Sequence, residues 1–469
     1  MSANFSASIF LPDETATDTL GLELSKVLEA GDALLLSGPV GAGKSHLARA
    51  IIKARLDREE DVPSPTYTLV QTYLDETGTE IWHADLYRLG DTSEIAELGL
   101  EDAFSNAICL VEWADRLGDR RPKDALSIMF KHEDSGRSLT LASTNFSWAK
   151  VSRALERTEF LIDANWQAAL MSDVAGDLSS RSYRRLRMAD QTAILMDAGD
   201  DPVQTVNFVK MTHWLRGAGY SAPEIISENT KTGLLLLEDF GDVPLSDYEE
   251  IDNQLSVCID LLADIRQQPC PKLYSPSVAE LVEMTALSNQ YPGAGIESLE
   301  VFRRSLHKAL EEVMAGVPAT VSLRDFHADN IMWLGERSGI QRLGMLDYQD
   351  AFLTHPVYDL VSLLTDARRD VPRALRDEMI AYYADLTGDN PSDLIKAFAV
   401  FSVQRNLRIL GIFARAAIVN RKNHHVKNLP RVYDYLSEAV EHPIFSDSGA
   451  LLLSALPKPD EALLAHLAA

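Results

Sequence analysis

Cysteine is scarce in this chain, which has only three among 469 residues. Cys109, Cys258 and Cys270 show no metal-ligand spacing, and we expect small buried hydrophobes in a reduced compartment. Long apolar runs are missing as well, so no transmembrane helix of about 18 apolar residues is expected. The segment 1–11 lacks the basic stretch and cleavage pattern of a secretory signal. These features predict a cytoplasmic protein without a membrane partner.

Positive charge is in deficit. The 44 Lys and Arg residues stand against 70 Asp and Glu, which gives a net charge of −26. The first 150 residues carry 25 acidic and 14 basic groups, and the remainder carries 45 and 30. Because an acidic surface repels phosphate backbones, we expect no direct, tight binding of nucleic acid by either part. Any connection with nucleic acid would have to pass through a partner protein.

The pattern of strands and helices changes along the chain. Residues 1 to about 145 alternate apolar strand-like runs with helical stretches, which is typical of an α/β domain. Residues 175 to 240 again indicate strands and turns, and the pattern from 250 onward is mainly helical. We therefore predict two domains, at 1–148 and 155–469. The second domain would divide into a small lobe, about 155–245, and a large helical lobe, about 246–469.

The segment Gly38–Ser45 is a complete G-x-x-x-x-G-K-S loop between an apolar strand and a helix. The backbone N–H groups of such a loop point at phosphates, and its glycines let the chain turn tightly. Lys44 would reach the β- and γ-phosphates, and the Ser45 hydroxyl would ligate Mg²⁺. A chance match in a glycine-rich turn is the alternative. The predicted nucleotide-binding residues here are Gly38, Gly41, Gly43, Lys44, Ser45 and His46.

Two acidic residues that end predicted strands are candidates for the metal and for hydrolysis. Glu112 follows the apolar run 108–111, a Walker-B-like position, and Asp85 ends the strand 80–85. A solvated acid at a strand end is the alternative for each. The strands predicted in this domain are 68–73, 80–85, 107–112, 126–130 and 138–142, the last two flanking a hairpin turn at 132–136.

Together these motifs resemble the bacterial TsaE family, the small ATPase of tRNA threonylcarbamoyladenosine biosynthesis. The resemblance implies that Thr66 lies in a switch-like loop near the nucleotide, that Asp85 and Glu112 serve the metal and hydrolysis, and that His83 is structural. Trp113 would lie near the nucleotide or a partner surface, with a core role as the alternative. The implied partners are the other proteins of threonylcarbamoyladenosine synthesis. The matching stretches are 38–45, 64–70, 83–89, 97–100 and 111–113.

A second motif points to kinase chemistry. Asp325 and Asn330 have the D-x-x-x-x-N spacing of a catalytic loop, in which the aspartate orients the attacking hydroxyl and accepts its proton. Asp347, which follows the apolar turn 343–346, would hold Mg²⁺ together with Asn330. We interpret His327 as a residue that forms hydrogen bonds within the loop, with substrate contact as the alternative.

The expected nucleotide lobe departs from the protein-kinase pattern. Met196 stands where the strand 192–196 would usually end in lysine, and the helical stretch 203–217 has no glutamate. Both partners of the usual Lys–Glu ion pair are therefore missing. Arginines, which can fork onto phosphate oxygens, would supply positive charge instead, unless they form a solvated strand face. The nucleotide-binding candidates are Arg181, Arg184 and Arg185, beside the turn 176–180, and Glu238 at the expected hinge.

This region resembles the aminoglycoside phosphotransferase superfamily, and within it the AmgK group of anomeric sugar kinases. That group phosphorylates C1 of N-acetylmuramate and N-acetylglucosamine, so the resemblance implies an amino-sugar substrate and a role in peptidoglycan recycling. The missing lysine belongs to the pattern of that group. The matching stretches are 176–187, 192–197, 235–242, 323–331, 345–351, 358–364, 366–372 and 404–415.

The predicted fold class is α/β: a P-loop NTPase domain followed by a bilobal protein-kinase-like fold. The predicted function is that of a bifunctional enzyme using ATP and Mg²⁺, a tRNA-modification ATPase fused to a sugar-1-phosphate-forming kinase. Three alternatives stay open. The second domain could phosphorylate another small alcohol, such as an aminoglycoside or choline, or could be a pseudokinase that only binds nucleotide. The first domain could be a generic P-loop phosphotransferase.

Overall fold

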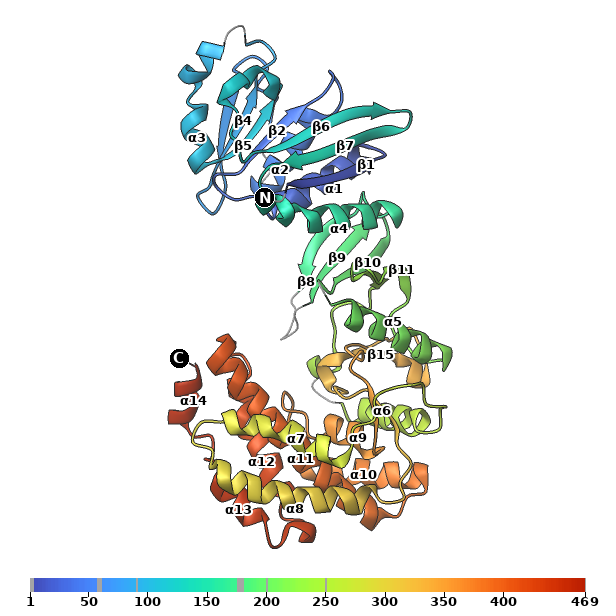
Figure 1. The fold of residues 1–469 in the computed structure, drawn as a ribbon. Coiled ribbons are helices and arrows are strands. Elements are labelled where there is room, and N and C mark those ends of the chain that lie inside the picture. The colour runs from blue at the N-terminus through green and yellow to red at the C-terminus, as the bar shows by residue number, and fades with distance from the viewer. Residues whose placement is uncertain are drawn as a thin grey trace. The chain divides into compact units, whose positions relative to one another are not determined.

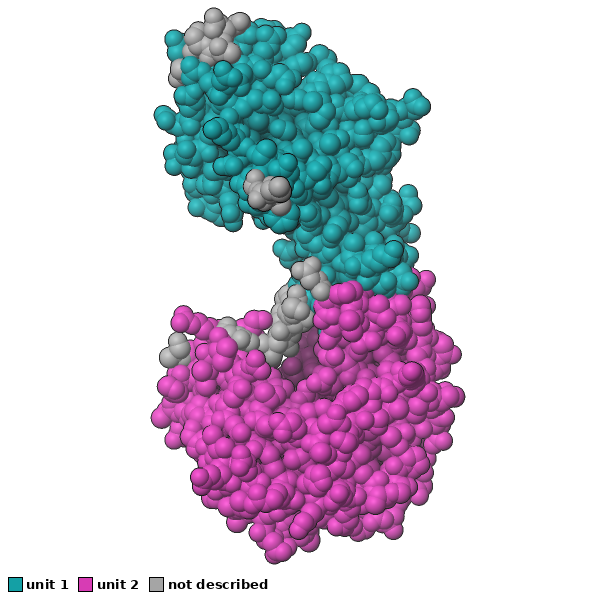
Figure 2. Space-filling model, viewed as in Figure 1, with its two compact units in different colours: residues 1–200, 226–237 teal, residues 201–225, 238–469 magenta. Residues whose placement is uncertain are grey.

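The computed structural model describes residues 4–56, 61–89, 92–174, 181–199, 201–248 and 251–468. The chain forms two compact units, coloured separately in Figure 2. The first unit contains the predicted P-loop domain together with most strands of the predicted small lobe. The units are Met1–Asp200 with Ile226–Leu237, and Asp201–Ile225 with Glu238–Ala469.

A seven-stranded sheet forms the centre of the P-loop domain (Figure 1), with the order β1-β7-β6-β2-β5-β4-β3. Its middle strand β2 is parallel to β5 and β6, and β4 is parallel to β5. Leu34 and Leu36 of β2 join one hydrophobic core, whereas Ala33 and Leu35 join another. The sheet is therefore buried on both faces. The strands are β1 (Phe5–Leu11), β2 (Ala33–Ser37), β3 (Val70–Leu74), β4 (Glu80–Asp85), β5 (Ile108–Glu112), β6 (Leu126–Glu133) and β7 (Gly136–Ser143).

The helices of this domain cover the sheet. They are α1 (Glu14–Ser25), α2 (Lys44–Leu56) and α3 (Leu100–Asn106), with short 3₁₀ helices at Thr92–Leu98, Ala114–Arg120 and Phe146–Val151. In α1 the Asp13 side chain caps the N-terminus by accepting a bond from the Ala16 amide at 2.8 Å.

The predicted strands are confirmed, although several of their ends differ by a few residues and one further strand is present. β6 and β7 continue until Glu133 pairs with Gly136, so the hairpin turn has two residues and not the five predicted. β1 adds an edge strand that pairs antiparallel with β7. Cys109 and Cys258 are buried as expected, but Cys270 is exposed, so the expectation that all three are buried was wrong.

A five-stranded sheet, with the order β11-β12-β10-β9-β8, forms the small lobe. Helix α4 (Ser152–Asp163) lies between α1 and this sheet in Figure 1. The helical stretch predicted after residue 203 is α5 (Pro202–Gly217), capped by the Asp201 side chain. The strands are β8 (Leu170–Val174), β9 (Ser182–Met188), β10 (Gln191–Asp197), β11 (Ile225–Asn229) and β12 (Leu234–Glu238).

The second unit is mainly helical, as predicted. Two short antiparallel pairs, β13 with β16 and β14 with β15, hold the two loops of the kinase motif. These strands are β13 (Thr320–Ser322), β14 (Ile331–Trp333), β15 (Leu343–Met345) and β16 (Phe352–Thr354). The helices after α5 are α6 (Asp252–Ile265), α7 (Val278–Glu283), α8 (Ile296–Met314), α9 (Val357–Leu364), α10 (Arg373–Thr387), α11 (Pro391–Asn420), α12 (Leu429–Ala439), α13 (Gly449–Ala455) and α14 (Glu461–Ala468).

Helix α11 is the longest element of the large lobe. Its segment Pro391–Val419 is the one described helix long and apolar enough to cross a membrane by length and composition. Within the protein, 83% of the apolar window is buried. The core helix of a globular lobe has the same properties, and α11 packs against α8, α9, α10 and α12.

Candidate active sites

The P-loop joins the buried strand β2 to α2, as its sequence predicts. Gly38 and Gly43 have φ angles of +139° and +101°, in the left-handed region that favours glycine. A Cβ atom on Gly38 would lie 2.5 Å from the carbonyl oxygen of Phe130, so no larger residue fits there unless β6 moves. Gly41 has a φ of +73° and open space around it.

Lys44 is the first residue of α2 and is almost fully buried. Its ammonium group donates hydrogen bonds to the carbonyl oxygens of Gly38 (2.9 Å) and Pro39 (2.8 Å), and it lies 4.1 Å from the centre of the Trp113 ring. Burial lowers the pKa of Lys44, while the carboxylates of Glu112 and Asp85 offset part of that effect. The positive charge is thus held beside the loop.

Ser45, Glu112 and His83 form a hydrogen-bonded series behind the loop. The Ser45 hydroxyl donates to Oε2 of Glu112 at 2.8 Å, and Oε1 of Glu112 lies 2.9 Å from Nε2 of the fully buried His83. Because a carboxylate only accepts, Nε2 of His83 carries the proton in this pair. His83 therefore orients Glu112, in agreement with the structural role predicted for it.

The second carboxylate lies on the adjacent strand. Asp85 pairs in register with Glu112 across parallel strands β4 and β5, so both acids leave the sheet at the same edge. Oδ2 of Asp85 accepts a hydrogen bond from the Thr66 hydroxyl at 2.6 Å, and Oδ1 accepts one from the Tyr87 amide at 3.0 Å. The structure thus brings Thr66, Asp85, Glu112 and Ser45 together at the loop, as predicted.

This donor set fits Mg²⁺, which prefers oxygen ligands and usually takes one or two carboxylates plus substrate phosphate oxygens. Ser45, Asp85 and Glu112 offer one hydroxyl and two carboxylates. No group of three or more His, Cys, Asp or Glu in the described ranges could hold a metal ion by itself.

Three neighbours of the loop differ from what sequence reasoning foresaw. Arg137 approaches so closely that a Cβ atom on Gly43 would lie 2.1 Å from its guanidinium. His132 lies 3.5 Å from the Val40 carbonyl oxygen. Both belong to the β6–β7 hairpin. His132 was predicted only as part of the turn, and no role was predicted for Arg137. The ring of His46 bonds Asp18 of α1 at 2.7 Å, so its side chain is engaged there and not with the nucleotide as predicted.

In the second unit, the catalytic loop lies between β13 and β14. The Asn330 side chain donates to the Asp325 carbonyl oxygen at 3.0 Å, and the His327 amide donates to the same oxygen at 3.1 Å. Hydrogen bonds between its own residues therefore hold the conformation of the loop. Nε2 of His327 lies 3.3 Å from Nδ2 of Asn330, which agrees with the predicted loop role.

The pairing of β14 with β15 brings the metal-binding candidates together. Ile331 pairs with Met345, and the Leu346 amide donates to the Asn330 carbonyl oxygen at 2.9 Å. Asp347, the next residue, has a φ of +54°, and its carboxylate accepts a bond from Gln349 at 2.9 Å. An amide oxygen and a carboxylate at this spot fit a Mg²⁺ site completed by phosphate oxygens.

Two buried residues that the sequence analysis did not assign support this loop. Asp359 of α9 accepts hydrogen bonds from the Ser322 hydroxyl and from the amides of Leu323 and Arg324, at 2.6–3.0 Å. Those bonds hold Arg324 at a φ of +71°, directly before Asp325. Burial raises the pKa of Asp359 to about 6, although the three bonds oppose that effect.

Arg405 of α11 is the second of these residues. Its guanidinium is buried, donates to the Arg324 carbonyl oxygen at 3.0 Å and lies 3.6 Å from Oδ1 of Asp325. Burial alone would raise the pKa of Asp325, but the charges of Arg405 and Arg408 lower it below its usual value. The stretch 404–415 was noted only as part of the family resemblance, because the sequence does not show that Arg405 of this mostly buried helix reaches the catalytic loop.

The small-lobe arginines lie in different places. Arg184 is buried and forms two hydrogen bonds with Glu23 of α1, one of them 3.2 Å long, so it is not placed to bind phosphate as predicted. Arg185 points to the opposite sheet face. Opposite residues on paired strands share a face, and Tyr183 pairs with Met196, so Arg185 shares the face of Met196. Arg181 lies 3.3 Å from the Tyr183 hydroxyl; the turn 176–180 lies outside the described residues.

Glu238 lies at the end of β12, where the hinge was predicted. Its carboxylate is paired with Arg337 and lies 3.6 Å from Arg216, and it accepts the Glu224 amide at 3.1 Å. Its own amide donates to the Glu224 carbonyl oxygen at 2.8 Å. The Glu238 side chain is therefore a structural ion-pair partner at the end of β12.

These features define an α/β protein with two phosphate-handling centres, a P-loop ATPase-type domain and a kinase-like phosphotransferase domain. Residues 11–139 match the family of threonylcarbamoyl adenosine biosynthesis protein TsaE, and residues 171–392 match the phosphotransferase enzyme family. The chain belongs to the TsaE family in its N-terminal part. Its C-terminal part is a phosphotransferase-family domain that resembles N-acetylmuramate/N-acetylglucosamine kinases.

Individual relatives agree with this division. The tRNA threonylcarbamoyladenosine biosynthesis protein TsaE of Rickettsia felis is 34% identical over 139 residues, which cover 30% of this chain and 81% of that protein. The N-acetylmuramate/N-acetylglucosamine kinase of Caulobacter vibrioides is 29% identical over 345 residues, covering 63% of this chain and 94% of that protein. The corresponding kinase of Pseudomonas aeruginosa is 28% identical over 312 residues, covering 61% and 89%.

Proposed function

We propose that this chain is a bifunctional cytoplasmic enzyme. Its P-loop domain hydrolyses ATP in support of tRNA threonylcarbamoyladenosine synthesis, and its kinase domain phosphorylates the anomeric hydroxyl of N-acetylmuramate or N-acetylglucosamine in peptidoglycan recycling. The observation that supports two activities is that the two sites share no residue. Ser45, Asp85 and Glu112 belong to the first, and Asp325, Asn330 and Asp347 to the second.

In the P-loop domain, Lys44 would exchange the carbonyl oxygens of its own loop for phosphate oxygens. Glu112, oriented by His83, and Asp85, oriented by Thr66, would hold the metal and the attacking water. Mg²⁺, when bound, would neutralise phosphate charge. The acidic domain is not suited to grip tRNA, so its partners are the proteins of the threonylcarbamoyladenosine pathway and its output is a change in their conformation.

In the kinase domain, Asp325 would orient the sugar hydroxyl and accept its proton. An anomeric hydroxyl is more acidic than an ordinary sugar hydroxyl, so a base with a lowered pKa can serve it. Asn330 and Asp347 would hold Mg²⁺. Arg185 lies on the same sheet face as Met196, which stands at the usual lysine position. We therefore assign the phosphate-binding charge of the small lobe to Arg185 and no longer to Arg184.

The test is a coupled assay that measures ADP formation by the whole chain against a panel of amino sugars, aminoglycosides and choline. Stimulation by N-acetylmuramate or N-acetylglucosamine, with a product whose phosphorus couples to the anomeric proton in NMR, supports the proposal. The Asp325→Asn variant serves as the matched control for background hydrolysis by the P-loop domain. A phosphate on C6, or stimulation only by choline or an aminoglycoside, would assign another alcohol. Nucleotide binding without turnover on any compound would indicate a pseudokinase.

A further inference from the structure

Helix α4 belongs to two hydrophobic cores at once. Its residues Ala154 and Leu155 pack in the core of the P-loop domain, together with Trp148 and Val151 of the preceding turn. Phe160 and Leu161, less than two turns further along, pack instead in the core of the small-lobe sheet. The stretch between the two domains is therefore not a linker, since both cores lose side chains if α4 is removed.

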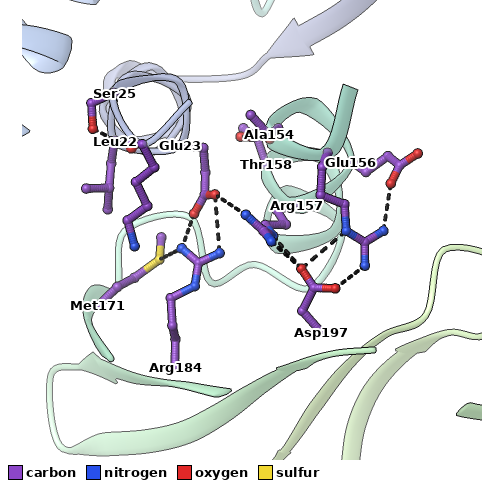
Figure 3. Close-up of polar contacts among 12 residues, drawn as sticks. Leu22, Glu23, Ser25, Ala154, Glu156, Arg157, Thr158, Met171, Arg184 and Asp197 are labelled. Carbon is purple, nitrogen blue, oxygen red and sulfur yellow. Dashed lines mark hydrogen bonds and ion pairs between the residues drawn. The ribbon is translucent and has the colours of Figure 1, made fainter. Parts of the chain in front are cut away.

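A buried charge network lies along the same helix (Figure 3). Glu23 of α1 is fully buried and bonds Arg184 of β9 on one side and Nη1 of Arg157 of α4, at 3.3 Å, on the other. Arg157 continues to Asp197 of β10 through Nε at 2.6 Å. Arg153 bonds the same carboxylate through Nε at 3.2 Å. Four elements, α1, α4, β9 and β10, are thereby joined through their charges.

The sheet register explains why these side chains meet. Arg184 pairs with Leu195 on adjacent strands, so the two share a face, and Asp197, two residues on, lies on that same face. This is the face that α4 covers with Phe160 and Leu161. Burial alone would raise the pKa of Asp197, but hydrogen bonds from Arg153 and the Gly199 amide lower it below its usual value. The carboxylate is thus held in its charged form.

Helix α1 also contacts α2, the helix that follows the nucleotide loop. It packs against α2, the helix that begins with Lys44, so closely that a Cβ atom on Gly21 would lie 2.4 Å from that of Ala50. Asp18 bonds His46 of α2 at 2.7 Å. At its other side, the Thr19 hydroxyl donates to the Gln167 carbonyl oxygen, in the segment after α4, at 2.5 Å. One short helix thus contacts both the P-loop helix and the approach to the small lobe.

We infer that the P-loop domain and the kinase small lobe form one cooperative folding unit, joined by α4 and the Glu23 network, so that a ligand of the P-loop stabilises the small-lobe sheet. Cooperative units open together, and a ligand that binds only the closed form protects every part of the unit. The P-loop domain would thus be a built-in partner of the kinase.

The first test is hydrogen exchange of the full chain at increasing urea. In Glu23→Gln, two buried arginines lose their charged partner, a change that is strongly destabilising at buried sites. Amides of α1–α2 and of β9–β10 should both exchange about 100-fold faster than in the wild type. The control is Glu133→Gln, which removes an exposed ion pair with Lys131 and should change exchange less than about fivefold. Acceleration in only one of the two regions would overturn the inference.

A double variant separates the charge pair from general packing damage. Glu23→Met combined with Arg184→Met replaces both charges by apolar side chains of similar length, which buried pairs often tolerate. We expect this variant to exchange more slowly than either single variant, in both regions. If exchange in the double variant is accelerated by as much as the two single effects combined, Glu23 and Arg184 do not act as a pair and the inference fails.

The second test adds Mg-ADP until α2 itself becomes protected from exchange. The wild type should then also gain protection in β9–β10 beyond that seen in Lys44→Ala, whose kinase site is unchanged and supplies the background. Protection of α2 without extra protection of β9–β10 would show two independent units.

Discussion

Replacing Arg405 by glutamine should move the acid limb of the kinase pH profile to higher pH. Asp325 must be ionised to accept a proton from the sugar hydroxyl, and its pKa lies below the usual value partly because of Arg405. Since the active carboxylate exists only above its pKa, the wild-type domain should keep its activity to a lower pH than the variant. At pH 7 the carboxylate stays ionised in both, so the difference should be small there.

The structure sets the size of this effect. Two unit charges 3.6 Å apart, the distance from Arg405 to Asp325, interact by about 5 kcal/mol at an effective dielectric constant of 20. Part of this interaction energy is compensated in the variant, because the charges of Arg408, Arg324 and His327 also lower the pKa of Asp325 and remain in place. A loss of only about a third of that 5 kcal/mol would still change the protonation equilibrium of Asp325 about tenfold. The acid limb should therefore move by at least about one pH unit.

The assay is kcat/KM for sugar phosphorylation between pH 4.5 and 8, because this parameter follows ionisations of the free enzyme. Arg405→Lys is the control, since it keeps the charge but not the planar guanidinium that bonds the Arg324 carbonyl oxygen. Its acid limb should stay near that of the wild type. An unchanged limb in Arg405→Gln, in a protein that remains folded, would refute the electrostatic role of Arg405.

Four further outcomes are expected. Lys44→Ala should abolish ATP hydrolysis by the P-loop domain and leave sugar phosphorylation within about twofold; loss of both in folded protein would contradict independent sites. Asp325→Asn should lower phosphorylation at least about 100-fold while calorimetry still detects nucleotide binding; unchanged turnover would point to Asp329 or Asp350 as the base. Purified proteins of the threonylcarbamoyladenosine pathway should accelerate ATP hydrolysis, whereas tight partner-free tRNA binding at physiological salt would count against this role. Asp197 should stabilise the fold above its usual pKa of 3.8 and lose that effect as pH falls through its lowered value, so the gap in melting temperature to Asp197→Asn should be constant near neutral pH and close in acid.

The P-loop and the catalytic loop could be predicted because each is continuous in sequence. Residues from Gly38 to Ser45, and from Asp325 to Asn330, carry their chemistry within one turn of chain. That Asp85 and Glu112 lie close together could also be predicted, because the carboxyl ends of parallel strands meet at one edge of a sheet. Such predictions need only the local pattern and one rule of sheet geometry.

What the sequence could not predict depends on contacts between distant segments. Arg184 and Arg185 are neighbours with identical chemistry, yet alternate on a strand, and only the packing of α4 decides which face is covered by the P-loop domain. Arg405 reaches Asp325 from α11, a helix about 80 residues further along the chain that carries other arginines as well. Arg137 approaches the P-loop because the hairpin is longer than its turn residues suggested. None of these contacts leaves a short motif.

The left-handed backbone at both sites has a consequence for how this enzyme could be stabilised. Among the described residues, the non-glycine positions with positive φ include Leu69, Trp113, Arg324 and Asp347, each within three residues of a proposed site residue. A side chain in that conformation costs roughly 1–2 kcal/mol, which glycine would avoid. Selection for heat resistance alone should therefore enrich glycine at these positions. The backbone of the stabilised proteins would be more flexible where the metal and the base must be held. Their activity should therefore fall as their melting temperature rises.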